Sequence, residues 1–263
     1  MDLNLRNKIA IVTGASRGLG FATALLLAQE GARVAINSRN PENIEMASQK
    51  IYHLTGTPVL PIAGDVSQSE TAQRVIEKVA QEWGGVDILI TNAGGPPAGK
   101  FESFSLEDWQ NAVNLNFISA VTLIQAALPY LRKSAAPAVL TVTSISVKQP
   151  IDGLVLSNSV RAATIGLTKS LALELGKDGI RFNSILPGWT STERVEQLLH
   201  HRAKTNNSTI EEERQKIASQ TALGRLADPQ EFARVAVFLV SPAASYLTGS
   251  MIAVDGGFYR GTF

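Results

Sequence analysis

The sequence has no cysteine and few histidines, and these absences narrow the function classes open to it. Among 263 residues there are no Cys and three His. Without Cys the chain supplies no disulfide, no thiolate nucleophile and no thiolate metal ligand. His53, His200 and His201 lack the HExxH spacing of a metal site, so we predict no metal.

Excess charge of one sign and long apolar runs are also missing. Formal net charge is +1, from 24 basic and 23 acidic residues, which gives no electrostatic reason to expect nucleic acid or an anionic membrane. The stretch Val235–Val240 is far shorter than the ~20 residues that span a bilayer. Met1–Arg6 lacks the basic and apolar regions of a signal peptide. We expect no nucleic-acid or membrane partner and a cytoplasmic location.

What the chain does contain is a regular alternation of strand-like and helix-like segments. The strand-like segments are continuous apolar runs, typical of strands covered on both faces in a parallel sheet. Their alternation with helices predicts a Rossmann-like, doubly wound α/β fold with a mostly parallel seven-stranded sheet and helices on both faces. With 44% hydrophobic residues, residues 1–263 suit a single domain. The predicted strands are residues 8–13, 33–37, 59–63, 86–91, 138–143, 181–186 and 251–254.

Several predicted helices have recognisable start signals. Asn40-Pro41 and Asp228-Pro229 read as N-cap plus first-turn proline. Ser67-Gln68-Ser69-Glu70 reads as a capping box that opens a helix ending at Trp83. Further helices are expected over residues 19–30, 105–131 and roughly 158–175.

Residues 191–226 are polar, helical in character and of mixed charge, with a Thr209–Glu212 capping box inside. They lie where a lid over a site would be, and we predict that they shape substrate access. The alternative is a solvent-exposed helical insertion with no recognition role.

A glycine-rich turn follows the first predicted strand. It reads Thr13-Gly14-Ala15-Ser16-Arg17-Gly18-Leu19-Gly20. Glycines let a backbone turn tightly and approach a pyrophosphate, which then sits at the positive N-terminal end of the next helix. We predict that this turn opens a dinucleotide site.

At this point the chain resembles the short-chain dehydrogenase/reductase family, and further matches follow in the family's order. They cover nearly the whole chain. They are Asp65-Val66 (adenine contact), Asn92-Ala93-Gly94 (structural motif), Pro187-Gly188-Trp189 with Thr192 (nicotinamide amide), and the C-terminal segments Tyr246–Gly249 and Val254–Gly257.

The end of the second strand bears on which nucleotide is bound. NAD-specific sites place an acid there for the ribose 2′-hydroxyl, whereas this chain has Asn37-Ser38-Arg39. Arg39, together with Arg17, can pair with a 2′-phosphate, so we predict NADP(H) in preference to NAD(H). The alternative is that both arginines are ordinary surface charges. The predicted cofactor-binding residues are Gly14, Ser16, Arg17, Gly18, Leu19, Gly20, Ser38, Arg39, Asp65, Val66, Asn92, Ala93, Gly94, Arg161, Pro187, Gly188 and Thr192.

The family resemblance also implies a catalytic tetrad of Asn, Ser, Tyr and Lys, and here two members are replaced. Asn116 and Ser144 match the first two. The tyrosine position is Ser157, 13 residues after Ser144, and the lysine position four residues later is Arg161. We take Asn116, Ser144, Ser157 and Arg161 as the candidate catalytic residues.

The missing tyrosine changes the expected chemistry. A phenol with a pKa near 10 can be tuned toward neutrality by a cation, whereas a serine hydroxyl cannot, and general acid–base catalysis contributes roughly 10²–10⁴-fold. Substitutes for the acid are a water relay through Ser144 and Ser157, or a proton from Asp152, Lys148, His200 or His201. Each of these four residues has a competing structural interpretation. Asp152 would lie in a turn, Lys148 would be a loop charge, and His200 and His201 would lie at a solvated helix end.

Three functions remain open. The first is an atypical NADP(H)-dependent oxidoreductase resembling 3-oxoacyl-[acyl carrier protein] reductases, acting on a ketone, an acyl thioester or a secondary alcohol. The second is a non-catalytic nucleotide-binding or regulatory protein, and a dehydration or isomerisation is a weaker third. The family resemblance implies packing across two-fold axes. Small residues in the 158–175 helix (Ala162, Ala163, Gly166, Ser170, Ala172) suit such packing, so we expect a homotetramer or homodimer.

Overall fold

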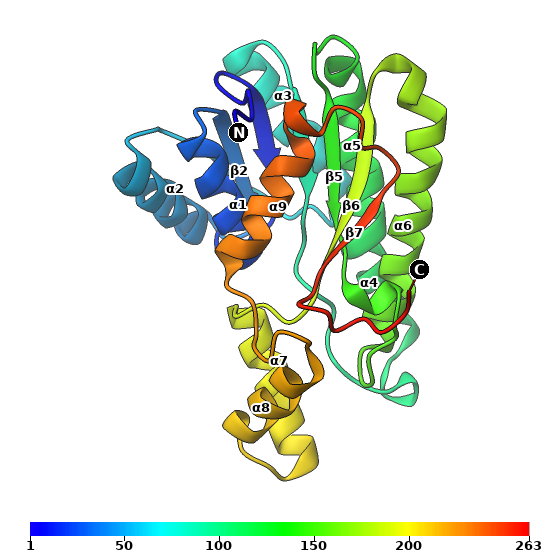
Figure 1. Cartoon of the computed structure of the whole chain (residues 1–263). Coiled ribbons are helices and arrows are strands. Elements are labelled where there is room, and N and C mark those ends of the chain that lie inside the picture. Colours follow the sequence, from blue (N-terminus) through cyan, green and yellow to red (C-terminus); the bar gives the residue numbers. More distant parts are fainter. Residues whose placement is uncertain (263) are drawn as a thin grey trace.

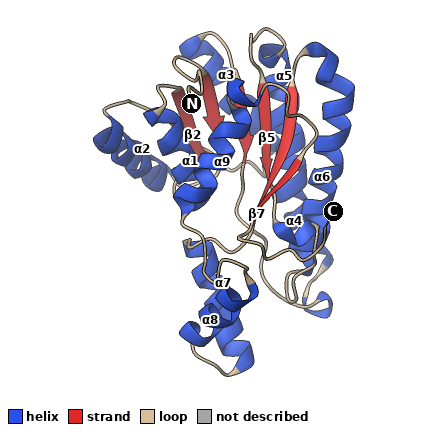
Figure 2. Cartoon of the chain, viewed as in Figure 1, coloured by secondary structure: helices blue, strands red, loops and turns tan. Residues whose placement is uncertain are grey.

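The computed structural model, which describes residues 1–262, is built on a single seven-stranded sheet, with helices packed around it (Figures 1 and 2). The strand order is β3-β2-β1-β4-β5-β6-β7, and every pair of neighbours is parallel. The predicted doubly wound fold is therefore confirmed, with a sheet that is wholly rather than mostly parallel. The strands are β1 (Ile9–Val12), β2 (Arg33–Ser38), β3 (Leu60–Ala63), β4 (Ile88–Thr91), β5 (Ala138–Val142), β6 (Arg181–Pro187) and β7 (Met251–Val254).

Helices cover both faces of the sheet. In β1, Ala10 and Val12 pack into the cluster formed with helices α1 (Gly18–Gln29), α2 (Pro41–Thr55) and α9 (Pro229–Val240). Ile11 packs into the cluster formed with α3 (Ser69–Trp83), α5 (Ser119–Leu131) and α6 (Val155–Leu175). Both sides of the strand are thus buried, which is why its sequence is uninterruptedly apolar. The helices are α1 (Gly18–Gln29), α2 (Pro41–Thr55), α3 (Ser69–Trp83), α4 (Leu106–Val113), α5 (Ser119–Leu131), α6 (Val155–Leu175), α7 (Glu193–Asn206), α8 (Ile210–Gln220) and α9 (Pro229–Val240).

Most of the predicted helix starts are confirmed, and one is wrong. Asn40 accepts a hydrogen bond from the Asn43 amide, and Asp228 and Thr209 each form a capping box. The predicted Ser67 box is not formed, because Gln68 is the N-cap of α3 and makes no side-chain cap. The Ser67 amide instead donates to the carboxylate of Asp65, which draws Ser67 into the preceding turn.

The helix predicted over 105–131 is interrupted. A π-helical turn, Asn114–Ile118, separates α4 from α5 and contains Asn116. Such turns occur frequently at functional sites. The whole run Leu106–Leu131 is long and apolar enough to span a membrane by length and composition alone. One face of α5, including Leu123 and Ala127, is buried in the domain core, as in a core helix of a globular protein.

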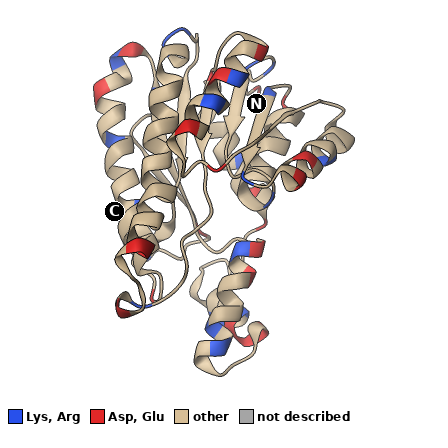
Figure 3. Ribbon diagram, turned by 180° about the vertical axis from the view of Figure 1, so that it is seen from behind, with Lys and Arg blue, Asp and Glu red and all other residues tan. Residues whose placement is uncertain are grey.

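Helices α7 and α8 project from the edge of the domain below the sheet, and charges of both signs gather on them (Figures 1 and 3). A separate apolar cluster, with Leu199 and Ile217 at its centre, joins the two helices to Trp189. The predicted helix end at His200 and His201 is wrong, because both residues lie inside α7, where they are exposed.

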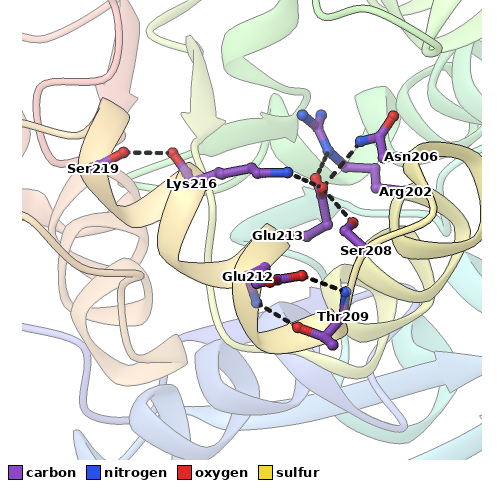
Figure 4. Close-up of polar contacts among 8 residues, drawn as sticks. All are labelled: Arg202, Asn206, Ser208, Thr209, Glu212, Glu213, Lys216 and Ser219. Carbon is purple, nitrogen blue, oxygen red and sulfur yellow. Dashed lines mark hydrogen bonds and ion pairs between the residues drawn. The ribbon is translucent and has the colours of Figure 1, made fainter.

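A buried carboxylate holds α7 and α8 together (Figure 4). Glu213 of α8 is fully buried and accepts hydrogen bonds from Arg202 (3.2 Å), Asn206 (3.1 Å), Ser208 (2.8 Å) and Lys216 (2.8 Å). These hydrogen bonds, of which the one from Lys216 has the largest effect, lower the pKa of Glu213 to about 2. The unit therefore has an ionic core of its own, distinct from the apolar core of the sheet.

Candidate functional site

A cavity of about 740 Å³ opens at the carboxyl ends of the strands. It runs from the turn after β1, past the ends of β2 and β4, to the ends of β5 and β6. Residues of α7 close one side. Ligands of open α/β sheets bind at this edge, where the strand order reverses, and here the reversal lies between β1 and β4.

The glycine-rich turn is held by Asn92, which follows β4. The Asn92 side-chain amide donates to the carbonyls of Thr13 (3.1 Å) and Gly14 (3.0 Å). A Cβ on Gly20 would lie 2.4 Å from the Gly14 carbonyl oxygen and 2.8 Å from the Asn92 amide nitrogen. Only glycine fits at this contact, so Gly20 packs the turn and does not itself line the cavity.

The turn fits a pyrophosphate. Gly14 and Gly18 have φ values of 57° and 59°, a conformation that favours glycine. Arg17 is the N-cap of α1 and offers no side-chain acceptor to the first amide groups of the helix. Gly94, across the cavity, has open space where a side chain would project. Free helix-terminal amides and an approachable backbone are what a dinucleotide phosphate needs.

The two arginines assigned to a 2′-phosphate differ in their surroundings. Arg39 lines the cavity, is exposed, and has no hydrogen bond or ion pair within residues 1–262. The Arg17 guanidinium lies 2.5 Å from the carboxylate of Glu193 at the start of α7. The glycine-rich turn and the 191–226 segment thus meet through an ion pair between residues that are 176 positions apart.

Nearly all the predicted site residues come together. Every predicted cofactor-binding residue except Gly20 lines the cavity, and so do Ser144, Ser157 and Arg161. Asn116 does not line it. The Asn116 side-chain oxygen is buried without a partner, and its backbone carbonyl accepts from the Thr164 hydroxyl at 2.9 Å, which ties the π-helical turn to α6.

The predicted tetrad positions that line the cavity hold two hydroxyls and one buried guanidinium. Ser144 follows β5, and Ser157 lies in the first turn of α6, which begins three residues earlier than predicted. Arg161, one turn further along α6, is 8% exposed. Its Nη1 donates to the backbone carbonyls of Val142 (3.0 Å) and Thr143 (2.9 Å) at the end of β5. Burial and the nearby charge of Arg194 lower the pKa of Arg161 to about 10, so it stays protonated at neutral pH.

No side chain in the cavity replaces the tyrosine as an obvious acid. None of the four tyrosines lines the cavity, and neither do Lys148, Asp152, His200 or His201. Asp108 does line it, but two hydrogen bonds from Ser105 lower the pKa of its carboxyl. Asp108 is therefore ionised at neutral pH and caps α4, which leaves the water relay through Ser144 and Ser157 as the remaining prediction.

Sequence reasoning missed one prominent cavity residue, Arg194 of α7. Its Nη2 donates to the Pro96 carbonyl at 2.5 Å, and a Cβ on Gly95 would lie 2.9 Å from its Nε. The guanidinium thus packs on the loop that follows Asn92-Ala93-Gly94. Its position two residues after Thr192 was the only available signal, and the sequence alone does not say which way the side chain points.

The chain is similar in sequence and in structure to several known proteins. The family model described as "Enoyl-(Acyl carrier protein) reductase" matches residues 14–259. The chain is 33% identical over 255 residues to a 3-oxoacyl-[acyl-carrier-protein] reductase of Thermotoga maritima, covering 97% of this chain and 99% of the relative. It is 35% identical over 260 residues to a 3alpha-hydroxysteroid dehydrogenase of Mediterraneibacter gnavus, covering 97% and 98%. The crystal structure of L-sorbose reductase from Gluconobacter frateurii, complexed with NADPH and L-sorbose, superposes with a TM-score of 0.94 at 33% identity, covering 99% and 100%.

Proposed function

Because the chain belongs to the short-chain dehydrogenase/reductase family, we propose that it is an atypical NADP(H)-dependent oxidoreductase that reduces a carbonyl or runs the reverse oxidation. The observation that carries this proposal is one cavity that joins the glycine-rich turn to Ser144 and Ser157. The names of its relatives, a 3-oxoacyl-[acyl-carrier-protein] reductase and an L-sorbose reductase solved with NADPH, support a ketone or 3-oxoacyl thioester as substrate.

The residues divide the work as follows. A bound nicotinamide cofactor would supply the hydride. The amides of the glycine-rich turn and of α1 hold its pyrophosphate, and Pro187, Gly188 and Thr192 border its nicotinamide end. The hydroxyls of Ser144 and Ser157 orient the carbonyl oxygen and relay a proton from water. Arg161 keeps a positive charge beside that oxygen, where preorganised charge stabilises a developing alkoxide.

A non-catalytic nucleotide-binding or regulatory role is the second candidate. It is favoured by a specific observation, since no tyrosine lines the cavity and Nη1 of Arg161 is already bonded to the carbonyls of Val142 and Thr143. A protein of this kind would keep the cofactor site and lose the chemistry.

Turnover with and without the two serines distinguishes these functions. We expect NADPH to be oxidised when a ketone or a 3-oxoacyl thioester is supplied. The substrate panel also contains 2-enoyl thioesters, because the matching family model is described as an enoyl reductase. We expect the Ser144→Ala/Ser157→Ala double variant to lose about 10²-fold in kcat, since it removes both proton-relay hydroxyls. The exposed Ser219→Ala variant is the control.

NADPH binding without turnover of any substrate supports the non-catalytic role. Full turnover by the double variant would show that the tetrad positions do not carry the chemistry.

The cofactor preference makes a second prediction. Arg39→Ala is expected to weaken NADPH binding about 10- to 100-fold and to leave NADH binding unchanged, because a charge-assisted contact to phosphate is lost. Arg17→Ala is expected to do less, since Arg17 already has a carboxylate partner. Exposed pairs of this kind are worth about 0–1 kcal/mol, so Glu193→Gln should free Arg17 and tighten NADPH binding slightly. Calorimetric titration of both nucleotides measures all three effects, and equal losses for NADPH and NADH would refute the assignment.

Assembly and location remain part of the proposal. Ala162, Ala163, Gly166 and Ser170 are exposed on α6, as a close helix contact between copies requires, whereas Ala172 is buried in the core of its own chain. We propose a homotetramer or homodimer in the cytoplasm, and light scattering on a sizing column measures the mass.

A further inference from the structure

Two cationic side chains share the cavity without a carboxylate partner. Arg161 of α6 and Arg194 of α7 both line it, and neither forms an ion pair within residues 1–262. Their hydrogen bonds are to backbone carbonyls alone: Val142 and Thr143 for Arg161, and Pro96 for Arg194. The Nε and Nη2 of Arg161, and the Nε and Nη1 of Arg194, carry no hydrogen bond to described residues.

The acidic side chains of the same cavity are engaged elsewhere. Asp65 accepts from the Ser67 amide, Asp108 caps α4 through Ser105, and Glu193 pairs with Arg17. None of these three carboxylates is bonded to Arg161 or Arg194. The positive charge of the two guanidiniums is therefore not balanced by the walls of the cavity.

The two arginines also repel each other electrostatically. The charge of Arg194, together with burial, lowers the pKa of Arg161, and burial lowers that of Arg194. Like charges held close together and partly desolvated are costly unless an anion joins them. The arrangement persists because the fold anchors both guanidiniums: Arg161 at the end of β5, and Arg194 on the backbone at Gly95 and Pro96.

We propose that this cavity selects substrates bearing a carboxylate, which Arg161 and Arg194 bind beside the hydroxyls of Ser144 and Ser157. This inference rests on the proposed carbonyl reduction and narrows it to small oxo acids and their hydroxy acids, ahead of neutral ketones and thioesters. Guanidinium groups can bind a carboxylate through two parallel N–H donors. The free Nε and Nη2 of Arg161 form such a pair, whereas Arg194 offers a single N–H contact through its free Nη1.

We assign the pyrophosphate of the cofactor to other residues. It belongs at the glycine-rich turn and the start of α1, which contribute other residues of the cavity. The ribose that the lysine of a complete tetrad would bind is uncharged, so it does not neutralise the pair either. A carboxylate on the substrate would supply the balancing charge, and the NADPH affinity of Arg194→Gln distinguishes this contact from one to the pyrophosphate.

The test compares an acid with its neutral ester. The probes are acetoacetate and methyl acetoacetate, with NADPH present. In the unaltered protein we expect acetoacetate to have the lower KM. Arg194→Gln is expected to raise the KM for acetoacetate about 10- to 100-fold and to leave that for the ester within about twofold. Lys204→Gln, which removes the same charge from an exposed position of α7, is the control and should change neither KM.

Binding of acetoacetate to the NADP⁺-saturated protein, followed by calorimetry, keeps the inference testable if nothing turns over. Loss of that binding in Arg194→Gln, with NADPH affinity and melting temperature unchanged, supports the carboxylate site even when the proposed reaction fails. Reduction of the ester in preference to the acid, or Arg194→Gln without effect on acetoacetate, would overturn the inference and leave the proposed reaction standing.

Discussion

Gly20→Ala is expected to weaken NADPH binding by more than 10²-fold and to lower the free energy of unfolding by about 3 kcal/mol, the upper range for overpacking a tight site. The added Cβ would lie 2.4 Å from the Gly14 carbonyl oxygen and 3.0 Å from Ala15 Cα. Both are backbone atoms, so the turn itself must shift. The shift also breaks the hydrogen bonds by which Asn92 holds the turn in shape.

The matched control is Gly176→Ala, at the end of α6. Gly176 has φ −61°, and no atom lies within 4 Å of the Cβ it would carry. This change should leave NADPH binding as it is, and stability unchanged or slightly higher. Calorimetric titration with NADPH and denaturant unfolding give the two quantities. A Gly20→Ala protein that binds NADPH normally would show that the turn is not the pyrophosphate site.

The second large effect is expected at Glu213. Glu213→Ala should destabilise the α7–α8 unit by on the order of 3 kcal/mol, because a buried carboxylate with four donors is removed and those donors lose their common acceptor. Loss of hydrogen-exchange protection over α7 and α8, with β1 and β4 still protected, is the expected observation. Glu211→Ala, in the first turn of α8, removes an exposed carboxylate and should change stability by no more than ~0.5 kcal/mol.

The same carboxylate makes the unit sensitive to acid. The pKa of Glu213 is about 2 in the folded protein, below its ordinary value of 4.5. The contribution of ionised Glu213 to the stability of the α7–α8 unit is therefore fully present above pH 4.5 and is lost as the pH falls from 4.5 toward 2. Hydrogen exchange at stepwise lower pH should show α7 and α8 losing this protection in that window. If the protection of α7 and α8 fell with pH in the same way in Glu213→Ala and in the unaltered protein, this explanation would be wrong.

Much of the fold could be predicted because it follows from local pattern. A strand buried on both faces is mainly apolar, so β1, which reads Ile-Ala-Ile-Val, is visible as a continuous run. Asn40 and Asp228 cap their helices through bonds to residues only two or three positions away. The failed Ser67 box shows the limit of such local rules, because Asp65 offers the same amide a competing partner.

The candidate site divides in the same way. The glycine-rich turn and the Asn92-Ala93-Gly94 segment were predictable, because glycine spacing and the end of a strand follow from the order of residues. The hydrogen bonds that join them were not predicted. The direction of a long side chain was not. Arg17 is equally compatible with a phosphate and with Glu193, and Arg194 looked like one charge among many in a polar segment.

By itself, the sequence determined the doubly wound fold and the place of the glycine-rich turn, and it predicted a tetrad in which Ser157 and Arg161 stand at the tyrosine and lysine positions, because each depends on residue type at a spacing. Only the tertiary structure decided the partners of Arg17, Arg161, Arg194 and Glu213. Those partners are set by which backbone carbonyls and carboxylates the packed elements bring within hydrogen-bonding reach of a flexible side chain. Among the described residues, the cavity is lined by no tyrosine and contains the guanidiniums of Arg161 and Arg194, which have no carboxylate partner. The experiments above test whether such a cavity reduces an oxo acid.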